Sequence, residues 1–277
     1  MPELPETETI ARDLHATIAG ACVTGLVVLR ADVLRPPVST RAATARLRAK
    51  LRDRTITRVW RRAKSVVLSF DDLWHLVVTP RFTGALILDT PGAPDDYACL
   101  RLQLGDEREL RYTDVRRLGT VAFLDAEAFA QWSERLGPEP LDPEFTAERF
   151  SGCLRGSRRA IKSVLMDQSR LAGVGNIYAN EALWRAGIRP ARRASALTRI
   201  ERASLHRELI AVLREAVDAR GTSFRDYRDA FGARGGYASQ LKAYGRGGLP
   251  CPRCGTALMS SHSIDARATV WCAACQR

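Results

Sequence analysis

A proline-rich linker at residues 137–143 separates two different hydrophobic patterns, and this change constrains the fold more than any other feature of the sequence. Before the linker, a predicted helix over residues 5–18 carries Ile10, Leu14 and Ile18 on one stripe. Short runs rich in Val, Leu and Ile then alternate with turn signals; they are Ala21–Leu29, Ser65–Phe70, Leu76–Thr79, Ala85–Leu88, Cys99–Leu104, Glu109–Tyr112 and Thr120–Leu124. Strands at this spacing predict a β-sandwich or barrel, interrupted by one helix over residues 42–50.

Behind the linker the hydrophobic period is helical. The predicted helices are Pro143–Phe150, Ser157–Met166, Ile177–Ala186 and Thr198–Ala219. We therefore expect an α+β multidomain protein. Its predicted parts are an N-terminal helix with a β-sandwich (residues 1–136), the linker (137–143), a helical domain (144–240) and a cysteine module (241–277).

Four of the seven cysteines form two Cys-x-x-Cys pairs near the C-terminus. Cys251 and Cys254 are separated from Cys272 and Cys275 by 17 residues. Two intervening residues let a tight turn aim both sulfurs of a pair at one tetrahedral ion, so this spacing predicts a zinc ribbon. Four protein ligands close the coordination shell, and the expected cofactor is therefore one structural Zn²⁺. The other cysteines, Cys22, Cys99 and Cys153, are expected to be small buried hydrophobic residues.

The charge of the chain is unevenly distributed. The net charge is +12, but residues 1–150 carry a net of −1 and residues 151–277 a net of +13. The chain is rich in arginine, with 39 arginines and four lysines. A general arginine bias would make both halves basic, but the first half is not basic. The asymmetry therefore predicts a polyanionic partner, nucleic acid, held mainly by the C-terminal half.

The sequence shows no sign of a membrane or secretion segment. No apolar run reaches the ~18 residues that a membrane span needs, and an acidic N-terminus is unlike a signal peptide. We expect a cytoplasmic protein without a membrane partner.

The first six residues, Met1-Pro2-Glu3-Leu4-Pro5-Glu6, carry the clearest candidate for chemistry. Removal of Met1 would leave the secondary amine of Pro2 as the N-terminus. An α-amino group titrates near ~8, so a useful fraction is neutral and can attack a sugar carbon to form an imine. Glu3 and Glu6 would supply carboxylates for proton transfer. The alternative is an ordinary helix start, where proline and acidic residues are also common.

Two further stretches are typical of phosphate contacts. In Leu171–Leu183, Gly173 and Gly175 permit a tight turn before a helix that begins near Asn176, which could bind phosphate or cap the helix. The stretch Arg61-Arg-Ala-Lys64 precedes an apolar strand, and Lys64 is one of only four lysines. Lysine offers a compact point charge, although a lone lysine is usually solvated.

Together these motifs resemble the formamidopyrimidine-DNA glycosylase family, in the same order and over the whole chain. The resemblance implies a helical domain with a helix–two-turn–helix motif, and DNA held in a cleft between the domains. It implies a bifunctional DNA glycosylase/AP lyase of base excision repair. Such an enzyme removes oxidised purines such as 8-oxoguanine and formamidopyrimidines from duplex DNA, then cuts the strand by β,δ-elimination. Pro2 matches the nucleophile and Glu3 the general acid/base.

The resemblance also implies roles for residues outside the N-terminus. Lys64 matches a lysine that contacts phosphates and the damaged nucleotide, and Asn176 an asparagine that binds phosphate. Glu181 matches a glutamate near the active centre. Arg267, between the cysteine pairs, matches the arginine at the tip of a hairpin that enters the duplex. The expected partner is double-stranded DNA with a damaged base, bound by a monomer.

Two loops depart from the family's pattern. An enzyme that extrudes a nucleotide must fill the gap, usually with an apolar wedge and an arginine. The matching stretches are Arg81–Gly84 and Thr113–Gly119, with Arg116 and Arg117 in the second. Phe82 stands where the family usually has methionine, and Leu118 where it has phenylalanine. The preference for the opposite base is therefore not predicted.

Two other functions fit parts of the sequence. One is an endonuclease VIII-type glycosylase for oxidised pyrimidines, against which Leu4 and a loop over residues 222–236 argue. The other is a non-catalytic zinc-containing DNA-binding protein, which requires Pro2, Glu3 and Glu6 to serve only as a helix start.

Overall fold

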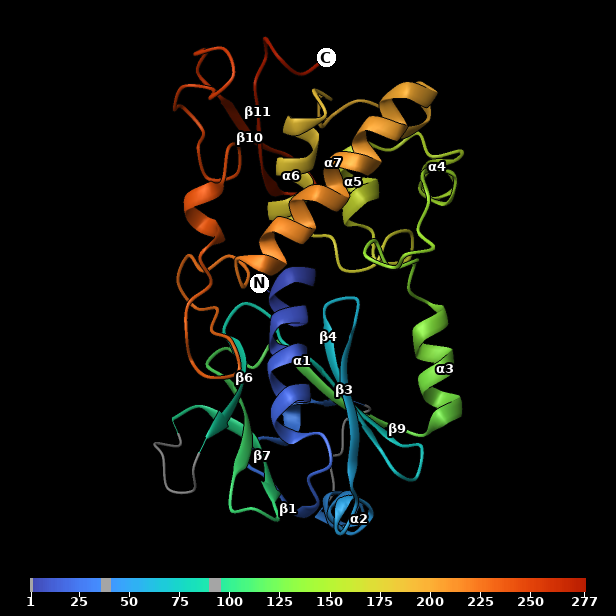
Figure 1. The fold of residues 1–277 in the computed structure, drawn as a ribbon, viewed down its shortest axis with the longest axis vertical. Helices are drawn as coiled ribbons and strands as arrows, with labels where there is room; N and C mark the ends of the chain where they lie inside the picture. Colours follow the sequence, from blue (N-terminus) through green and yellow to red (C-terminus); the bar gives the residue numbers. More distant parts are fainter. Residues whose placement is uncertain (1, 36–40, 90–95) are drawn as a thin grey trace. The chain divides into compact units, whose positions relative to one another are not determined.

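The computed structural model describes residues 2–35, 41–89 and 96–277, and of residues 41–43 the backbone alone. Met1, whose removal the sequence analysis expects, lies outside them. The chain forms two compact units (Figure 1). The first unit comprises Met1–Glu134 and Ala219–Gly236, and the second comprises Arg135–Asp218 and Tyr237–Arg277. The segment 219–236, which the sequence-based division places in the helical domain, thus packs with the N-terminal residues.

Two β-sheets and a long helix make up most of the first unit. One sheet has the order β1 (Val23–Val28), β7 (Ala98–Leu104), β8 (Glu109–Asp114), β6 (Gly84–Asp89). The other has the order β2 (Leu34–Arg35), β9 (Thr120–Leu124), β5 (His75–Thr79), β4 (Ser65–Phe70), β3 (Ile56–Arg62). Neighbouring strands are antiparallel except for β2 and β9. Helix α2 (Arg41–Leu51) packs near β1.

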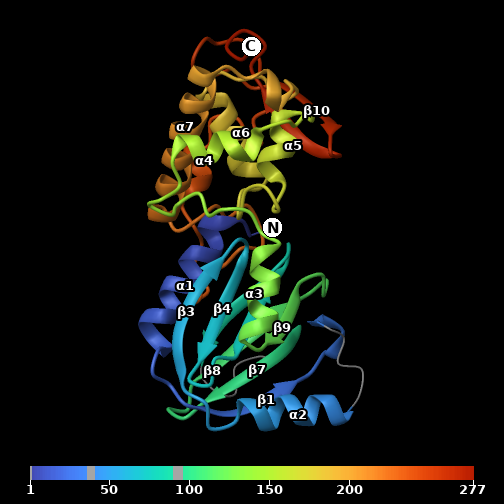
Figure 2. The same ribbon diagram turned by 90° about the vertical axis from the view of Figure 1, so that its right-hand side faces the viewer.

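The two sheets share one hydrophobic core. It includes Leu68 of β4, Leu102 of β7 and Tyr112 of β8. Helix α1 (Leu4–Ile18) packs against β3 and β4 (Figure 2). Its apolar stripe joins the same core. Each large apolar side chain buried in this way contributes about 1.5–3 kcal/mol. The α+β multidomain class is confirmed, and the core fixes the helix whose first turn holds Glu3 and Glu6.

The short strand β2, strand β3 and helix α3 of the first unit were not predicted. Strand β3 interleaves arginine with Ile56 and Val59 and so lacks a continuous apolar run. Helix α3 (Ala126–Glu134) buries no residue fully. Asp125 accepts the amide of Ala128 at the start of α3, and Phe129 packs its ring near Trp60 and His75. In β3 the buried Ile56 and Val59 are separated by exposed residues, and in α3 the apolar residues are only half-buried, so neither gives a clear apolar pattern.

Helices and a short hairpin form the second unit. The helices are α4 (Ala147–Leu154), α5 (Ile161–Met166), α6 (Asn176–Arg185) and α7 (Arg199–Asp218), and the hairpin strands are β10 (Met259–Ile264) and β11 (Arg267–Trp271). Helix α4 begins four residues later than the predicted Pro143 start, because the Thr146 hydroxyl caps it by accepting the amide of Arg149. No helix in the described ranges is both long and apolar enough to span a membrane.

Candidate functional site

The first three residues after Met1 form the entry to α1. Pro2 is buried and precedes the helix, and Glu3 is its N-cap residue in an extended conformation. The amide of Glu3 donates to Glu6 Oε2 at 2.8 Å, while the Glu3 side chain accepts the amide of Glu6. The two residues form a reciprocal capping box, and Glu3 is only 3% and Glu6 only 1% exposed. The expected helix-start role is therefore real, but Pro2 stands before the helix, next to two buried carboxylates.

Lys64 lies in a tight turn that is tied to the same helix. The turn joins β3 to β4, and Ala63 within it has a φ of 52°. Arg61 donates to the carbonyl of Ala63 and, through Nε, to Glu8 Oε2 of α1 at 2.8 Å. Burial alone would raise the pKa of Glu8, but Arg61 and Arg12 hold it below its ordinary value. The ionised pair therefore fixes the turn of Lys64 against α1.

Asp114 connects the two loops that the sequence analysis singled out. Its side chain is 1% exposed. Oδ1 accepts the hydroxyl of Thr83 at 2.6 Å and the amide of Arg116 at 3.2 Å, and Oδ2 accepts the amide of Gly119 at 2.8 Å and the hydroxyl of Tyr112 at 3.1 Å. A Cβ at Gly119 would lie 1.9 Å from that hydroxyl, so only glycine fits there.

The loops present a stacked pair of side chains. The guanidinium of Arg116 lies 4.4 Å from the centre of the Phe82 ring, within the range of a cation–π contact. Phe82 has a φ of 42° and Arg117 a φ of 51°, backbone values that side-chain-bearing residues adopt at a cost. Phe82 and Leu118 are 36% and 46% exposed. Two strained, exposed loops with an aromatic–arginine pair fit a wedge that is inserted into a DNA duplex. The neighbouring Arg117 forms an ion pair with Asp32 at 2.9 Å.

In the second unit, a glycine turn leads into α6. Gly175 is the N-cap residue and Asn176 occupies the first helical position, so Asn176 is not the cap. The turn is held by Gln168, which accepts the amide of Gly173 at 2.9 Å and donates to the carbonyl of Val174 at 2.8 Å. The amides of the first turn of a helix favour an anion, and Asn176 is half-buried beside them.

The hairpin of β10 and β11 places Arg267 directly after its turn. Asp265 and Ala266 both have positive φ, 52° and 51°, as in a two-residue type I′ turn. Arg267 is exposed. The buried ammonium of Lys162, from α5, donates to the carbonyl of Ala268 at 2.8 Å and to Thr269 Oγ1 at 2.7 Å.

A second buried residue anchors the same strand. Asn180 of α6 accepts the amide of Val270 at 2.8 Å and donates to the carbonyl of Asn176 at 2.6 Å. Lys162 and Asn180 are both 0% exposed. The exposed arginine thus stands on a backbone that two buried polar side chains fix.

Glu181 makes a different set of contacts from those of Glu3. Its Oε1 accepts the amides of Ala243 and Tyr244, and its Oε2 accepts the amide of Lys242, at 2.8–2.9 Å. Burial raises the pKa of Glu181, although the three amides oppose that shift. These contacts order residues 242–244.

The four cysteines of the C-terminal module lie together. The sulfurs of Cys251, Cys254, Cys272 and Cys275 are all within 4.8 Å of one another. A tetrahedral ion with metal–sulfur bonds of ~2.3 Å needs sulfur–sulfur distances of about 3.8 Å. Within each pair a short turn closes, with Gly255 N donating to Cys251 O at 2.9 Å and Gln276 N to Cys272 O at 3.0 Å. The cluster could therefore hold a metal ion.

This chain resembles known proteins of one family of DNA glycosylases. Residues 1–121 match the formamidopyrimidine-DNA glycosylase N-terminal domain, and residues 136–228 match the H2TH domain of the same enzyme. The formamidopyrimidine-DNA glycosylases of Roseiflexus sp. and Chloroflexus aggregans are 41% and 40% identical over 278 residues, covering all of this chain and 100% and 98% of theirs. This chain belongs to the formamidopyrimidine-DNA glycosylase family.

Solved structures of the family agree. The Lactococcus lactis enzyme in complex with DNA containing N7-benzyl-Fapy-dG superposes with a TM-score of 0.90 at 30% identity and full coverage of both chains. The enzyme of Thermus thermophilus gives 0.87 at 35% identity, covering 99% of this chain and 98% of its own. Family membership confirms the resemblance that the motifs indicated.

The predicted site residues fall into groups. The first unit holds Pro2, Glu3, Glu6, Lys64, Phe82, Arg116, Arg117 and Leu118, and the second holds Asn176, Glu181, Arg267 and the four cysteines. Asp114, Lys162, Gln168 and Asn180 were missed. Their importance comes from burial and hydrogen bonding, which composition does not reveal. Lys162 had one usable signal, because it is a lysine in an arginine-rich chain, as Lys64 is.

Proposed function

We propose that this protein is a bifunctional DNA glycosylase/AP lyase. It acts as a cytoplasmic monomer in base excision repair and removes oxidised purines from duplex DNA. The observation that carries the proposal is the capping box that places buried Glu3 and Glu6 directly after Pro2. A helix start alone requires neither a proline before the cap nor burial of both carboxylates.

The proposed chemistry begins at the amine of Pro2. The neutral amine attacks C1′ of the damaged nucleotide, a nitrogen–carbon bond forms, and the glycosidic bond to the base breaks. Glu3 donates the proton that the leaving base or the sugar oxygen takes up. The C1′–O4′ bond then opens, with a proton going to O4′, and leaves an iminium between Pro2 and C1′. The iminium acidifies C2′, so proton removal there expels the 3′ phosphate by β-elimination, and a second elimination expels the 5′ phosphate. Water then hydrolyses the iminium, which releases the unsaturated sugar remnant and restores the amine of Pro2.

DNA is held by groups from both units in this proposal. Arg116 and Phe82 fill the gap left by the extruded nucleotide, with Arg117 and Leu118 beside them. Lys64, Asn176 and Arg267 contact phosphates, which position the duplex without reading its sequence. Glu181 acts by ordering residues 242–244 through three amide hydrogen bonds.

The metal is proposed to be one Zn²⁺. Cys251, Cys254, Cys272 and Cys275 would hold it as four thiolates, and the ion would supply folding free energy to the hairpin region. Every ligand position is taken by protein, so no step of the reaction passes through the ion.

Borohydride trapping tests the proposal. Reduction of the imine should link wild-type protein covalently to a duplex containing 8-oxoguanine or an abasic site. Pro2→Gly should bind the duplex with similar affinity and trap far less. Failure of the wild type to trap would leave a non-catalytic DNA-binding protein, and equal trapping by Pro2→Gly would exclude Pro2 as the nucleophile.

A lesion panel separates the two enzyme classes. The Lactococcus lactis enzyme has also been solved with DNA containing an oxidised pyrimidine, so the panel should include both lesion types. Faster excision of 8-oxoguanine than of an oxidised pyrimidine supports the purine assignment, and the opposite order supports the endonuclease VIII-type alternative.

A further inference from the structure

Residues 219–236 form a closed loop within the first unit. We call this segment the return loop. Its ends meet where the amide of Gly236 donates to the carbonyl of Ala219 at 2.8 Å, and Thr222 and Gly236 form an isolated β-bridge. A Cβ at Gly235 would lie 2.3 Å from the carbonyl oxygen of Gly221, so the two arms cross too closely for any other residue. The return loop is therefore an Ω-loop with a fixed neck.

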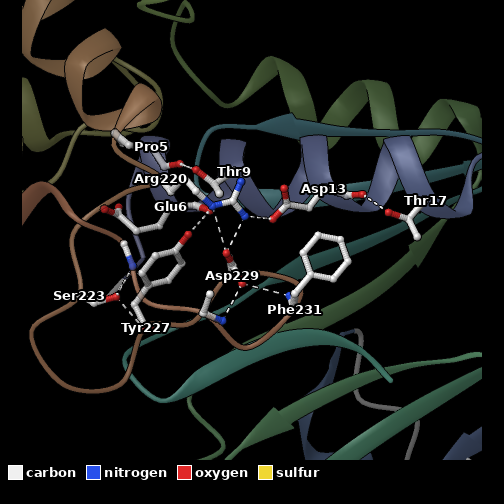
Figure 3. A network of polar contacts seen from close by, with 12 residues as sticks. Pro5, Glu6, Thr9, Asp13, Thr17, Arg220, Ser223, Tyr227, Asp229 and Phe231 are labelled. Atoms are coloured by element: carbon white, nitrogen blue, oxygen red, sulfur yellow. Dashed lines mark hydrogen bonds and ion pairs between the residues drawn. The ribbon is translucent and has the colours of Figure 1, made fainter. Parts of the chain in front are cut away.

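The return loop binds the first turn of α1. The amide of Thr222 donates to Glu6 Oε1 at 2.7 Å. The hydroxyl of Tyr227 donates to the carbonyl of Glu6 at 3.3 Å (Figure 3). The other carboxylate oxygen of Glu6 accepts the amide of Glu3 at 2.8 Å. One buried carboxylate thus connects the return loop to the residue that follows Pro2.

Arg220 bridges the return loop and α1 at a second point. Its Nη2 donates to Asp13 Oδ2 of α1 at 2.6 Å and to Asp229 Oδ2 of the loop at 2.5 Å (Figure 3). Asp229 is 1% exposed. Its remaining oxygen accepts the amides of Phe231 and Ala233 at 3.0 and 2.8 Å and so shapes the tip of the loop.

The backbone of Arg220 supports a specific role for its side chain. Its φ is 62°, in the left-handed region that favours glycine. A non-glycine residue persists in that region when surrounding contacts compensate for the strain. Here the compensating contacts are the two carboxylates, one of which would otherwise be a buried charge without its cation.

We propose that Arg220 is a positioning residue for the N-terminal nucleophile. By bridging Asp13 and Asp229 it keeps the return loop on α1, so that Thr222 holds Glu6 and Glu6 holds the amide of Glu3 beside Pro2. This inference rests on the proposed function, because it assigns Arg220 an effect on imine formation.

The test compares Arg220→Gly with Arg225→Gly. Both remove one positive charge from the return loop, but Arg225 is exposed and forms no ion pair with any residue that the structure describes. The glycine also relieves the strain at position 220, so lost activity there cannot come from an unfavourable backbone. We expect Arg220→Gly to lower the single-turnover trapping rate on saturating abasic duplex by about tenfold to a hundredfold, the size of effect that misplacement by ~1 Å produces.

Two measurements separate positioning from general damage. Affinity for a duplex with a stable abasic analogue should change less than threefold, and amide hydrogen exchange should speed up in the return loop and at Glu3. Arg220→Lys, which keeps the charge without the planar fork, should recover part of the rate. If Arg220→Gly does not fold, Asp13→Asn removes one arm of the bridge and should act in the same direction.

A trapping rate for Arg220→Gly within twofold of that for Arg225→Gly would overturn the inference, as would unchanged exchange at Thr222 and Glu3. If the wild type itself does not trap, the proposed function fails instead, and the two failures are therefore distinguishable.

Discussion

The two units use buried polar groups for different ends. In the first unit, Glu3 and Glu6 are buried at the start of a helix that Pro2 precedes. In the second, Lys162 and Asn180 are buried beneath a hairpin that exposes Arg267 to solvent. In the proposed function, the buried carboxylates beside Pro2 serve chemistry, whereas the buried polar groups under the hairpin strand present the charge of Arg267 outward. Catalysis and DNA affinity should therefore be separable by substitution.

Glu3→Gln should produce the largest effect, on chemistry alone. Glutamine can still take part in a capping box, so the fold and the affinity for DNA should be retained. Loss of the proton donor should slow excision of 8-oxoguanine by about 10²–10⁴-fold. Cleavage of a preformed abasic site should survive better, because no base must be protonated. Excision assays on both substrates check this, and wild-type excision by the variant would contradict the role of Glu3.

Cys254→Ser, or removal of the metal by chelation, should act on affinity through the second unit. The metal's binding free energy is folding free energy, so the hairpin should lose its frame and Arg267 its position. We expect lesion-duplex affinity to fall by about a hundredfold, comparable with the upper range for lost charge-assisted contacts. Cys153→Ser, outside the cluster, is the matched control. Wild-type affinity in a folded, metal-free protein would exclude a structural metal.

Phe82→Ala should have the smallest of the three effects. It tests whether the first unit contributes to DNA affinity as well as to chemistry. Stacking of an aromatic ring on a base contributes about 1–3 kcal/mol, or roughly tenfold to a hundredfold in binding. Leu118 cannot stack, so Leu118→Ala should cost less. Affinities for a duplex with a stable abasic analogue exclude effects on chemistry. A larger loss for Leu118→Ala than for Phe82→Ala would refute the idea that the aromatic role lies in the Phe82 loop.

The sequence predicted local elements well where an apolar run ended at clear turn signals. Strands β4 and β9 were predicted with the bounds that the structure shows. It failed for β2, which has only two residues, for β3, whose buried Ile56 and Val59 are separated by exposed residues, and for α3, whose apolar residues are only half-buried. The cysteine cluster followed from spacing alone, because two short turns bring the sulfurs together whatever surrounds them.

Long-range relations could not be predicted in the same way. Nothing in the local pattern of residues 219–236 shows that Arg220 binds Asp13, more than 200 residues earlier. The capping box of Glu3 and Glu6 was within reach, since both residues lie in one turn. The four contacts of Asp114 were not, because they join separate loops.

The bonds of Asp114 also bear on how members of this family diverge. Thr83 and Gly119 bind the same carboxylate from different loops, so the loops of Phe82 and Leu118 are coupled through Asp114. A substitution in one loop changes the hydrogen bonds of Asp114 and therefore the conformation of the other loop. The effects of substitutions in the two loops should therefore be non-additive. Substitutions in one loop are therefore expected to be accompanied by substitutions in the other.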